Sequence, residues 1–213
     1  MVRQDEDKRI LILGAGGHAK SVIDTIERQG IYEIAGVVDN ETRGRFYKEY
    51  DIIGTDEDLP RLFEDGIHTA FVGIGYLGDS PLRNRLYKML KEIGFELAVV
   101  VDPSAVLAND VSIGEGTFVG KLAVINSNAR IEAMSIINTA AVIEHDCVVG
   151  AFSHISVRST VCGGCVLEDG VLVGAGAVLI QGLSVGKDAI IAAGAAVTRN
   201  VEPGVRVMGV PAK

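Results

Sequence analysis

Residues 137–160 read INTAAV, IEHDCV, VGAFSH and ISVRST, four groups of six that each begin with Ile or Val. The same six-residue period runs without a break from Val101 to Glu202, and a Val, Ile or Leu occupies the first position of every group. Neither an amphipathic helix nor an alternating strand has this period, whereas a parallel β-helix with short flat faces and sharp corners does. The period predicts a prism in which each group of six forms one face.

The fifth position of each group is small or β-branched, with Leu183 as its one large exception. We expect the first and fifth positions to point into the prism. If three groups make one coil, residues that are three groups apart stack on one another, and each coil pairs with the next as parallel strands. Gly or Asn often follows the aliphatic residue, and we interpret these residues as accepting unusual backbone angles at bends: Gly114, Gly120, Asn126, Asn138, Gly150, Gly174 and Gly186.

The cysteines invite a metal or redox interpretation, because Cys162 and Cys165 form a CxxC. The phase of the repeat argues otherwise, since Cys147 and Cys165 both fall on the small inward position, one predicted coil apart. We expect both to be buried thiols that act as small hydrophobic side chains. Because no second ligand pair stands at a suitable spacing, we predict no metal site.

A different pattern precedes the prism. Residues 9–13 form a predicted buried strand that ends in the turn GAGGHA at 14–19, and a helix then runs until Gly30. Residues 34–38 form a second predicted strand, closed by Asp39. This order predicts a small Rossmann-like α/β domain with a parallel sheet.

The rest of this domain is predicted to hold a short helix after Thr55, a strand near residues 70–74 and a helix that starts at Ser80 and Pro81. The last helix is expected to bury Leu82, Leu86, Met89, Leu90 and Ile93. We place the α/β domain at residues 1–98 and the β-helix at residues 99–213.

In such sheets a Gly-rich turn lets backbone N–H groups approach a phosphate at a helix N-terminus, and Asp39 is placed to accept hydrogen bonds from a nucleoside. A dinucleotide would require a longer domain, and Ala19 replaces the third Gly of the usual fingerprint. We therefore expect a mononucleotide or a nucleotide-sugar rather than NAD. The turn alone is equally compatible with a purely structural role.

Two of the four histidines, His145 and His154, fall in the prism at positions that do not point inward. A surface histidine is the ordinary interpretation of such a position. For His145 the flanking Glu144 and Asp146 favour a catalytic interpretation instead, because an imidazole beside a carboxylate is held in one tautomer and made more basic. The sequence thus offers His145 as a general base.

Composition limits the possible partners. The net charge of −8 argues against nucleic acid. Apolar stretches such as residues 171–180 are shorter than the ~20 residues needed to span a bilayer. Six of the first nine residues are charged, which does not resemble a signal peptide. We expect a cytoplasmic protein with no membrane span.

Three strings together resemble one family: GAGGHAK at residues 14–20, IEHDCVVGAFSH at 143–154 and GVPAK at 209–213. They are similar to the bacterial sugar acetyltransferases of the hexapeptide-repeat acyltransferases. This branch includes sialic acid O-acetyltransferases and UDP-4-amino-sugar N-acetyltransferases. The resemblance implies a left-handed β-helix, a handedness that the period alone does not give.

The resemblance also implies roles for single residues. His145 would be the general base, Asp146 would raise its basicity, and His154 would contact acetyl-CoA near the thioester. Backbone at Ala175 and Ala193 would receive the pantetheine arm of CoA. The residues implied for the UDP-sugar are Gly16, Gly17, His18, Asp39, Asn40 and Gly75.

The family implies a homotrimer with its active sites between subunits. The implied activity is direct acetyl transfer from acetyl-CoA to the 4-amino group of a UDP-linked sugar in bacterial glycan biosynthesis, without a metal. O-acetylation of a sialic acid or a related sugar is the alternative within the enzyme class. A non-catalytic nucleotide-binding scaffold is the alternative outside it.

Overall fold

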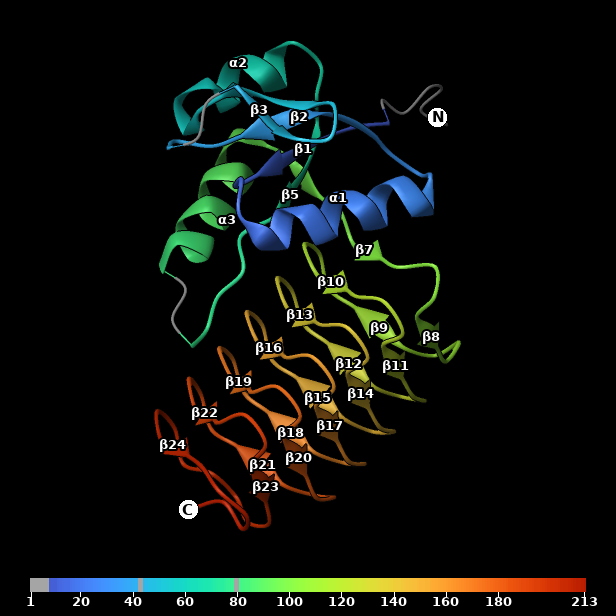
Figure 1. The fold of residues 1–213 in the computed structure, drawn as a ribbon, viewed down its shortest axis with the longest axis vertical. Coiled ribbons are helices and arrows are strands. Elements are labelled where there is room, and N and C mark those ends of the chain that lie inside the picture. Colours follow the sequence, from blue (N-terminus) through green and yellow to red (C-terminus); the bar gives the residue numbers. More distant parts are fainter. Residues whose placement is uncertain (1–7, 42–43, 79–80) are drawn as a thin grey trace. The chain divides into compact units, whose positions relative to one another are not determined.

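The computed structural model describes residues 8–41, 44–78 and 81–213 (Figure 1). The chain divides into two compact units, which we describe separately. The first holds Met1–Gly75 and Pro81–Ala98, and the second holds Tyr76–Ser80 and Val99–Lys213. The repeat pattern does not predict that the short segment Tyr76–Ser80 belongs with the prism.

A six-stranded sheet forms the centre of the first unit, in the order β3-β4-β2-β1-β5-β6. Among the strands that the structure describes in this sheet, β3 and β4 pair antiparallel and the other pairs are parallel. The apolar runs of β1 and β5 are almost wholly buried, as expected of parallel strands covered on both faces. The strands are β1 (Arg9–Leu13), β2 (Glu33–Val38), β3 (Arg45–Tyr47), β4 (Tyr50–Gly54), β5 (Thr69–Val72) and β6 (Glu96–Leu97).

The expected helices are present. Helix α1 spans Gly17–Gln29 and ends at Gly30, whose φ of 67° is left-handed, as a glycine after a helix C-terminus often is. A 3₁₀ turn at Asp56–Asp58 leads into α2 (Leu59–Glu64), and α3 spans Pro81–Ile93. The predicted cap Ser80 lies outside the described residues.

The buried face of α3 differs from the expected one. Leu86 and Leu90 are buried, but Leu82 is 42% exposed, and Met89 and Ile93 are only half-buried. Arg83 is buried instead, and its guanidinium donates hydrogen bonds to the carbonyl oxygens of Val72 and Ile74. These polar partners let a charged side chain displace a leucine from the packed face.

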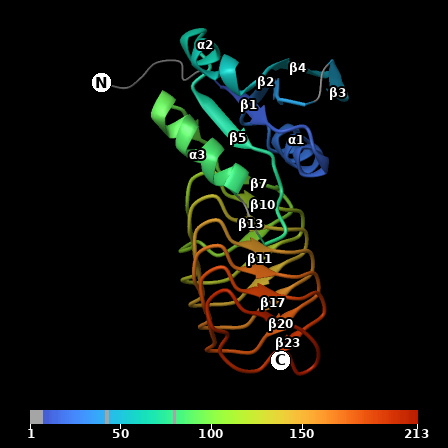
Figure 2. The same ribbon diagram turned by 90° about the vertical axis from the view of Figure 1, so that its left-hand side faces the viewer.

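The second unit is a left-handed parallel β-helix of two-residue strands stacked in three sheets (Figures 1 and 2). Partners lie three groups of six apart, as in Phe118, Ile136 and His154. The last coil is shorter, since Ile190 pairs with Arg206. One sheet runs β24-β22-β19-β16-β13-β10-β7, the second β23-β20-β17-β14-β11-β8 and the third β21-β18-β15-β12-β9.

The strands of the prism in chain order are β7 (Val100–Val101), β8 (Val106–Leu107), β9 (Ser112–Ile113), β10 (Phe118–Val119), β11 (Val124–Ile125), β12 (Arg130–Ile131), β13 (Ile136–Ile137), β14 (Val142–Ile143), β15 (Val148–Val149), β16 (His154–Ile155), β17 (Thr160–Val161), β18 (Val166–Leu167), β19 (Leu172–Val173), β20 (Val178–Leu179), β21 (Ser184–Val185), β22 (Ile190–Ile191), β23 (Ala196–Val197) and β24 (Arg206–Val207).

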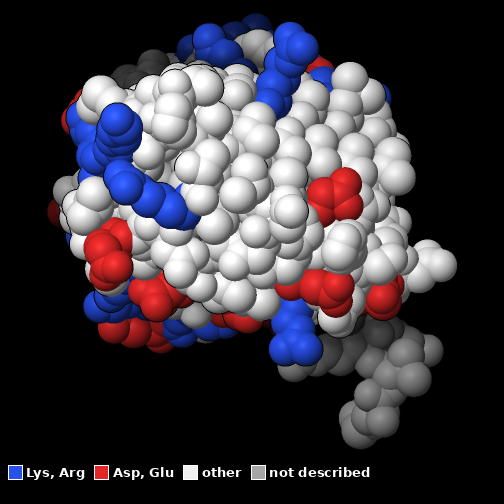
Figure 3. All heavy atoms as spheres, turned by 90° about the horizontal axis from the view of Figure 1, so that it is seen from below, with Lys and Arg blue, Asp and Glu red and all other residues white. Residues whose placement is uncertain are grey.

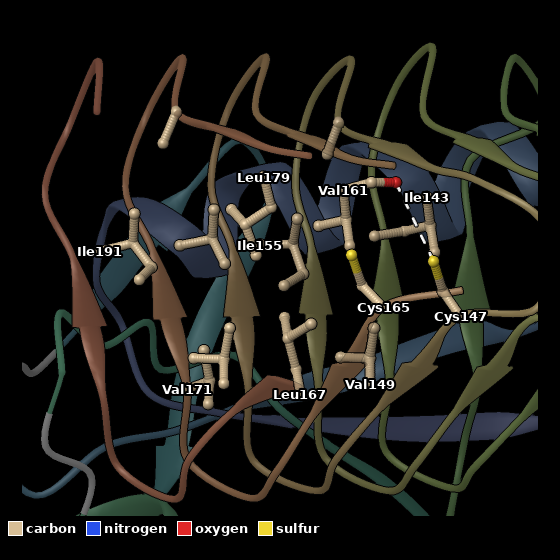
Figure 4. Close-up of a cluster of buried hydrophobic side chains, with 14 of the residues drawn as sticks. Ile143, Cys147, Val149, Ile155, Val161, Cys165, Leu167, Val171, Leu179 and Ile191 are labelled. Carbon is tan, nitrogen blue, oxygen red and sulfur yellow. Dashed lines mark hydrogen bonds between the residues drawn. The ribbon is translucent and has the colours of Figure 1, made fainter. Parts of the chain in front are cut away.

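The interior follows the predicted phase. From Val119 to Val197 the aliphatic first positions are all buried, and Cys147 and Cys165 are fully buried among them (Figure 4). The Cys147 Sγ donates to the carbonyl oxygen of Cys162 at 3.2 Å. The expectation of inward-facing thiols is confirmed.

The interpretation of the Gly and Asn positions as bends is wrong. The left-handed backbone lies two residues further on, for example at Leu122, Asn128 and Asp146, whose φ values are 58°, 60° and 60°. A Cβ on Gly114 would lie 2.5 Å from the backbone nitrogen of Ala133 in the next coil. Several of these glycines are therefore required by the close approach of successive coils rather than by their own backbone angles.

No helix among the described residues is both long and apolar enough to cross a membrane.

Candidate functional site

His145 lies at the corner that follows strand β14, where the chain turns from one sheet of the prism to the next. Its side chain is 63% exposed, and its Nδ1 lies 2.8 Å from Oδ2 of Asp146. Because a carboxylate only accepts, the neutral ring donates from Nδ1, and the lone pair is on Nε2. Within the described part of the chain, Nε2 makes no hydrogen bond.

The hydrogen bond that Nδ1 donates to Asp146 raises the pKa of His145 above its usual range, and the charges of Asp146 and Glu144 act in the same direction. Asp146 has its own second partner, because Nδ2 of Asn128 donates to Oδ1 at 2.7 Å. That bond, followed by the one to His145, lowers the pKa of the Asp146 carboxyl. The corner thus holds an ionised carboxylate against a histidine that is more basic than usual.

His154 points away from the prism interior, yet it is buried rather than exposed. Its Nδ1 donates to the carbonyl oxygen of Tyr76 at 2.8 Å, and Nδ2 of Asn138 lies 3.2 Å from its Nε2. The Tyr76 hydroxyl in turn donates to the carbonyl oxygen of Phe152. The ring therefore faces away from the interior, as expected, but Tyr76 of the same chain covers it, so it is not a surface histidine.

The Gly-rich turn lies at a topological switch point of the first sheet. Strand β1 is followed in the chain by β2 on one side, whereas β5 pairs with it on the other. In open α/β sheets ligands bind beyond the carboxyl ends of the strands at such a point. The turns after β1 and β5 are therefore the expected edge for a ligand.

Five of the predicted substrate residues meet at this edge. Gly16 and Gly17 are exposed, and His18 is half-buried in the first turn of α1. A Cβ on Gly75 would lie 3.4 Å from the Cβ of His18. Asp39 joins the turn directly, because the Ala15 N–H donates to its Oδ2 at 2.8 Å and the Glu41 N–H donates to its Oδ1 at 2.9 Å.

Asn40 has a different environment. Its Nδ2 donates to Oδ2 of Asp56 at 2.9 Å, and its Oδ1 accepts the Asp56 N–H at 3.0 Å. Arg85 also donates to Asp56 at 2.8 Å. Both ends of the Asn40 amide are therefore engaged, and a ligand would have to compete with Asp56 for them.

Ala175 and Ala193 are exposed and stack on each other, with the N–H of Gly194 donating to the carbonyl oxygen of Ala175 at 2.9 Å. They lie at the corner that leads from β19 and β22 into the sheet of β20 and β23. His145 lies at the opposite edge of that sheet, after β14. One chain therefore does not bring the predicted base and the predicted CoA backbone to the same corner.

Asn128 and Gly163 were not predicted as site residues. Each lies one coil away from a member of the His145–Asp146 pair, so the repeat phase could have found both. Tyr76 had no such signal, because its contact with His154 joins residues that are 78 positions apart. Among the described residues, no group of three or more His, Cys, Asp or Glu is arranged to hold a metal ion.

Comparison with known proteins agrees with the two-part fold. Residues 9–90 match the PglD N-terminal domain, and residues 164–199 match the hexapeptide repeat of succinyl-transferase. PerB from Caulobacter crescentus, solved with CoA and GDP-perosamine, is 37% identical with a TM-score of 0.89, and the match covers 96% of this chain and 95% of that one.

Two further solved structures are similar along nearly their whole length. The acetyltransferase domain of PglB from Neisseria gonorrhoeae, in complex with acetyl coenzyme A, is 28% identical with a TM-score of 0.89, and the match covers 98% of this chain and 99% of that one. WeeI from Acinetobacter baumannii is 27% identical with a TM-score of 0.86, and the match covers 96% and 98%.

A curated relative, the uncharacterized protein L142 of Acanthamoeba polyphaga mimivirus, is 28% identical over 128 residues. That match covers 60% of this chain and 24% of the relative, so it spans about a quarter of the relative's length.

The prism with its exposed histidine–carboxylate pair is that of a hexapeptide-repeat acyltransferase. Within that class, the chain belongs to the bacterial sugar acetyltransferases that join a PglD-type N-terminal domain to the β-helix.

Proposed function

We propose that this protein transfers the acetyl group of acetyl-CoA to the amino group of a nucleotide-linked amino sugar, with His145 as the general base. The observation that carries this proposal is the Nδ1 contact of His145 with Asp146 at 2.8 Å, which leaves Nε2 open on an exposed corner. A base of this kind contributes about 10²–10⁴-fold to proton transfer.

Besides a general base, the acetyl transfer requires only that the protein hold the two substrates together. The thioester carbonyl is already electrophilic, so an uncharged amine held against it can attack directly. Nε2 of His145 takes the amine proton as the tetrahedral intermediate forms, and the intermediate then expels the CoA thiolate. No Ser or Cys nucleophile takes part, and Cys147 and Cys165 are sealed inside the prism. Holding both substrates in register supplies several kcal/mol more.

We assign the nucleotide to the domain at residues 1–98 and acetyl transfer to the β-helix at residues 99–213. The diphosphate would bind the exposed N–H groups at Gly16 and Gly17, with His18, Asp39, Asn40 and Gly75 around it. A UDP-linked 4-amino sugar is our first candidate substrate. A GDP-linked amino sugar is the second, because the similar PerB was solved with GDP-perosamine.

For acetyl-CoA we assign the backbone at Ala175 and Ala193, with His154 near the thioester. Both ring nitrogens of His154 already contact groups within the chain. We therefore propose that His154 packs its ring against CoA rather than forming a hydrogen bond with it. Because acetyl-CoA and nucleotide sugars are made inside the cell, we place the reaction in the cytoplasm, in bacterial glycan biosynthesis.

We also propose a homotrimer. The sheet between the His145 corner and the Ala175 corner has an outer face that is apolar except for one threonine. None of its outward side chains is buried: Val106, Val124, Val142, Thr160, Val178 and Ala196. Viewed from below, much of the visible surface is uncharged (Figure 3). A threefold arrangement over this face would bring the His145 corner of one subunit to the Ala175 corner of the next.

A substrate panel tests the proposal. The purified protein is incubated with acetyl-CoA and, separately, UDP-, GDP- and dTDP-linked 4-amino sugars and free sialic acid, while free thiol release is measured. We expect release with a nucleotide-linked amino sugar and an N-acetyl product by mass spectrometry. Turnover of sialic acid alone would instead establish O-acetylation, and activity retained in His145→Ala would refute the assigned base.

A further inference from the structure

Asp146 is held between two side chains, one on each carboxylate oxygen. Its Oδ2 lies 2.8 Å from Nδ1 of His145, and its Oδ1 accepts from Nδ2 of Asn128 at 2.7 Å. The three residues form one continuous hydrogen-bonded row, Asn128 to Asp146 to His145. The row ends at the imidazole that the proposed reaction uses.

The β-helix itself brings Asn128 to this place. Asn128 and Asp146 occupy the same corner position in successive coils, with φ of 60° at each. The N–H of Asp146 donates to the carbonyl oxygen of Ser127 at 3.0 Å, which fixes the vertical spacing of the two corners. Both side chains are exposed, so neither contributes to the packed interior of the prism.

We propose that Asn128 is a positioning residue for the His145 base and that it acts through Asp146; this inference rests on the proposed function. An exposed aspartate at a corner can rotate about its side-chain bonds, and only some rotamers direct an oxygen at Nδ1. The amide of Asn128 selects the rotamer in which Oδ1 faces the preceding coil and Oδ2 faces the ring. The ring is thereby held with Nδ1 on Oδ2 of Asp146 and with Nε2 free of a hydrogen bond.

Asn128→Gly removes the amide, and glycine adopts a positive φ without strain, so the backbone of the corner is preserved. The matched control is Leu122→Gly, at the same corner position one group of six earlier, with φ of 58°. We expect Asn128→Gly to lower kcat about tenfold with an unchanged KM for acetyl-CoA. Leu122→Gly should leave kcat within about twofold of the parent.

A double-mutant cycle tests whether the effect passes through Asp146. In an Asp146→Ala background, Asn128→Gly should cause no further loss of kcat. The same tenfold loss in both backgrounds would show that Asn128 acts independently of the carboxylate and would overturn the proposal, as would an Asn128→Gly variant with full activity.

Proton NMR titration of the His145 ring gives a readout that needs no substrate, with the resonance assigned by its loss in His145→Ala. If Asn128 orients Asp146, the pKa of His145 falls in Asn128→Gly because the carboxylate no longer stays against Nδ1. A rise would mean that Asn128 only withdraws charge from Asp146, and an unchanged pKa would mean no link; either would overturn the proposal. A fall in this pKa without any acetyl transfer by the parent protein would instead count against the proposed function alone.

Discussion

The imidazole of His145 lies directly against the Cα of Gly163 in the next coil: a Cβ at that glycine would stand 2.6 Å from Nε2. The backbone of Gly163 is not left-handed, so the glycine is required by space and not by its angles. We predict that Gly163→Ala pushes the ring aside and lowers kcat on the order of a hundredfold, with little change in melting temperature. Steady-state kinetics and thermal unfolding check this.

The neighbouring glycine is the matched control for this prediction. A Cβ on Gly164 would meet nothing within 4 Å, but its φ of 69° strains any other residue. Gly164→Ala should therefore cost about 1 kcal/mol of stability and leave kcat near that of the parent. If the loss of kcat in each variant simply followed its loss of stability, the contact between His145 and Gly163 would not contribute to catalysis.

The contact between His145 and Asp146 should determine how activity depends on pH. The base acts when deprotonated, and Asp146 raises its pKa, so kcat/KM should fall as pH drops through a value above 6.5, the ordinary pKa of histidine. Asp146→Asn removes the raising charge, so the acid limb should move to lower pH while the plateau falls by about 10- to 100-fold. The substrate amine titrates identically with both proteins, so the difference between their profiles belongs to the enzyme. An unmoved limb would exclude His145 as the titrating base.

The prism could be predicted from sequence because its physics is periodic. Every sixth side chain meets the same interior, so the phase alone predicts that Cys147 and Cys165 are buried and that His145 points away from the interior, and both predictions agree with the structure. The same phase gave a wrong reason for Gly114, because close approach between coils depends on backbone in the next coil, which a single group of six does not reveal.

Contacts without a period could not be predicted. The burial of His154 depends on Tyr76, which lies in a segment with no repeat. In the first domain the hairpin of β3 and β4 was missed, because the run from Arg45 to Gly54 is rich in charged and aromatic residues and does not alternate cleanly. Arg83 was missed because its burial depends on two backbone carbonyl groups after β5 rather than on hydrophobicity.

Asp39 holds the Gly-rich turn, since each carboxylate oxygen accepts a backbone N–H. In Asp39→Asn one of these N–H groups would face an amide NH₂, so either the turn loses its bond at Ala15 or the side chain loses its second bond, at Glu41, and holds the turn less firmly. We predict that KM for the nucleotide-sugar rises about tenfold while KM for acetyl-CoA changes less than about twofold. Asp51→Asn, at an exposed aspartate on β4, should change neither. Equal effects of Asp39→Asn on both substrates would contradict a role confined to the nucleotide.

Removing the Tyr76 hydroxyl tests whether the residue that covers His154 contributes to stability or to catalysis. Tyr76→Phe removes the hydrogen bond to the carbonyl oxygen of Phe152 and keeps the ring that packs beside His154, whose centroid lies 5.7 Å away. We expect a loss of about 1 kcal/mol in the free energy of unfolding with kcat and both KM values preserved. Chemical denaturation measures the first and kinetics the second. A large rise in KM for acetyl-CoA would show that the hydroxyl serves the cofactor and not the fold.

Mixed oligomers test whether the base and the CoA backbone come from different subunits. His145→Ala lacks the base, and Ala193→Trp places a bulky ring on the corner proposed for CoA, so each variant alone should be nearly inactive. If a site combines the His145 corner of one subunit with the Ala193 corner of the next, every mixed trimer holds one intact site of three. Unfolding and refolding an equimolar mixture should then restore about a quarter of the parent activity, because about three quarters of randomly assembled trimers are mixed. The same two variants refolded separately and then combined should stay inactive. A refolded mixture without activity, despite mixed trimers detected by native mass spectrometry, would place both corners of a site on the same subunit.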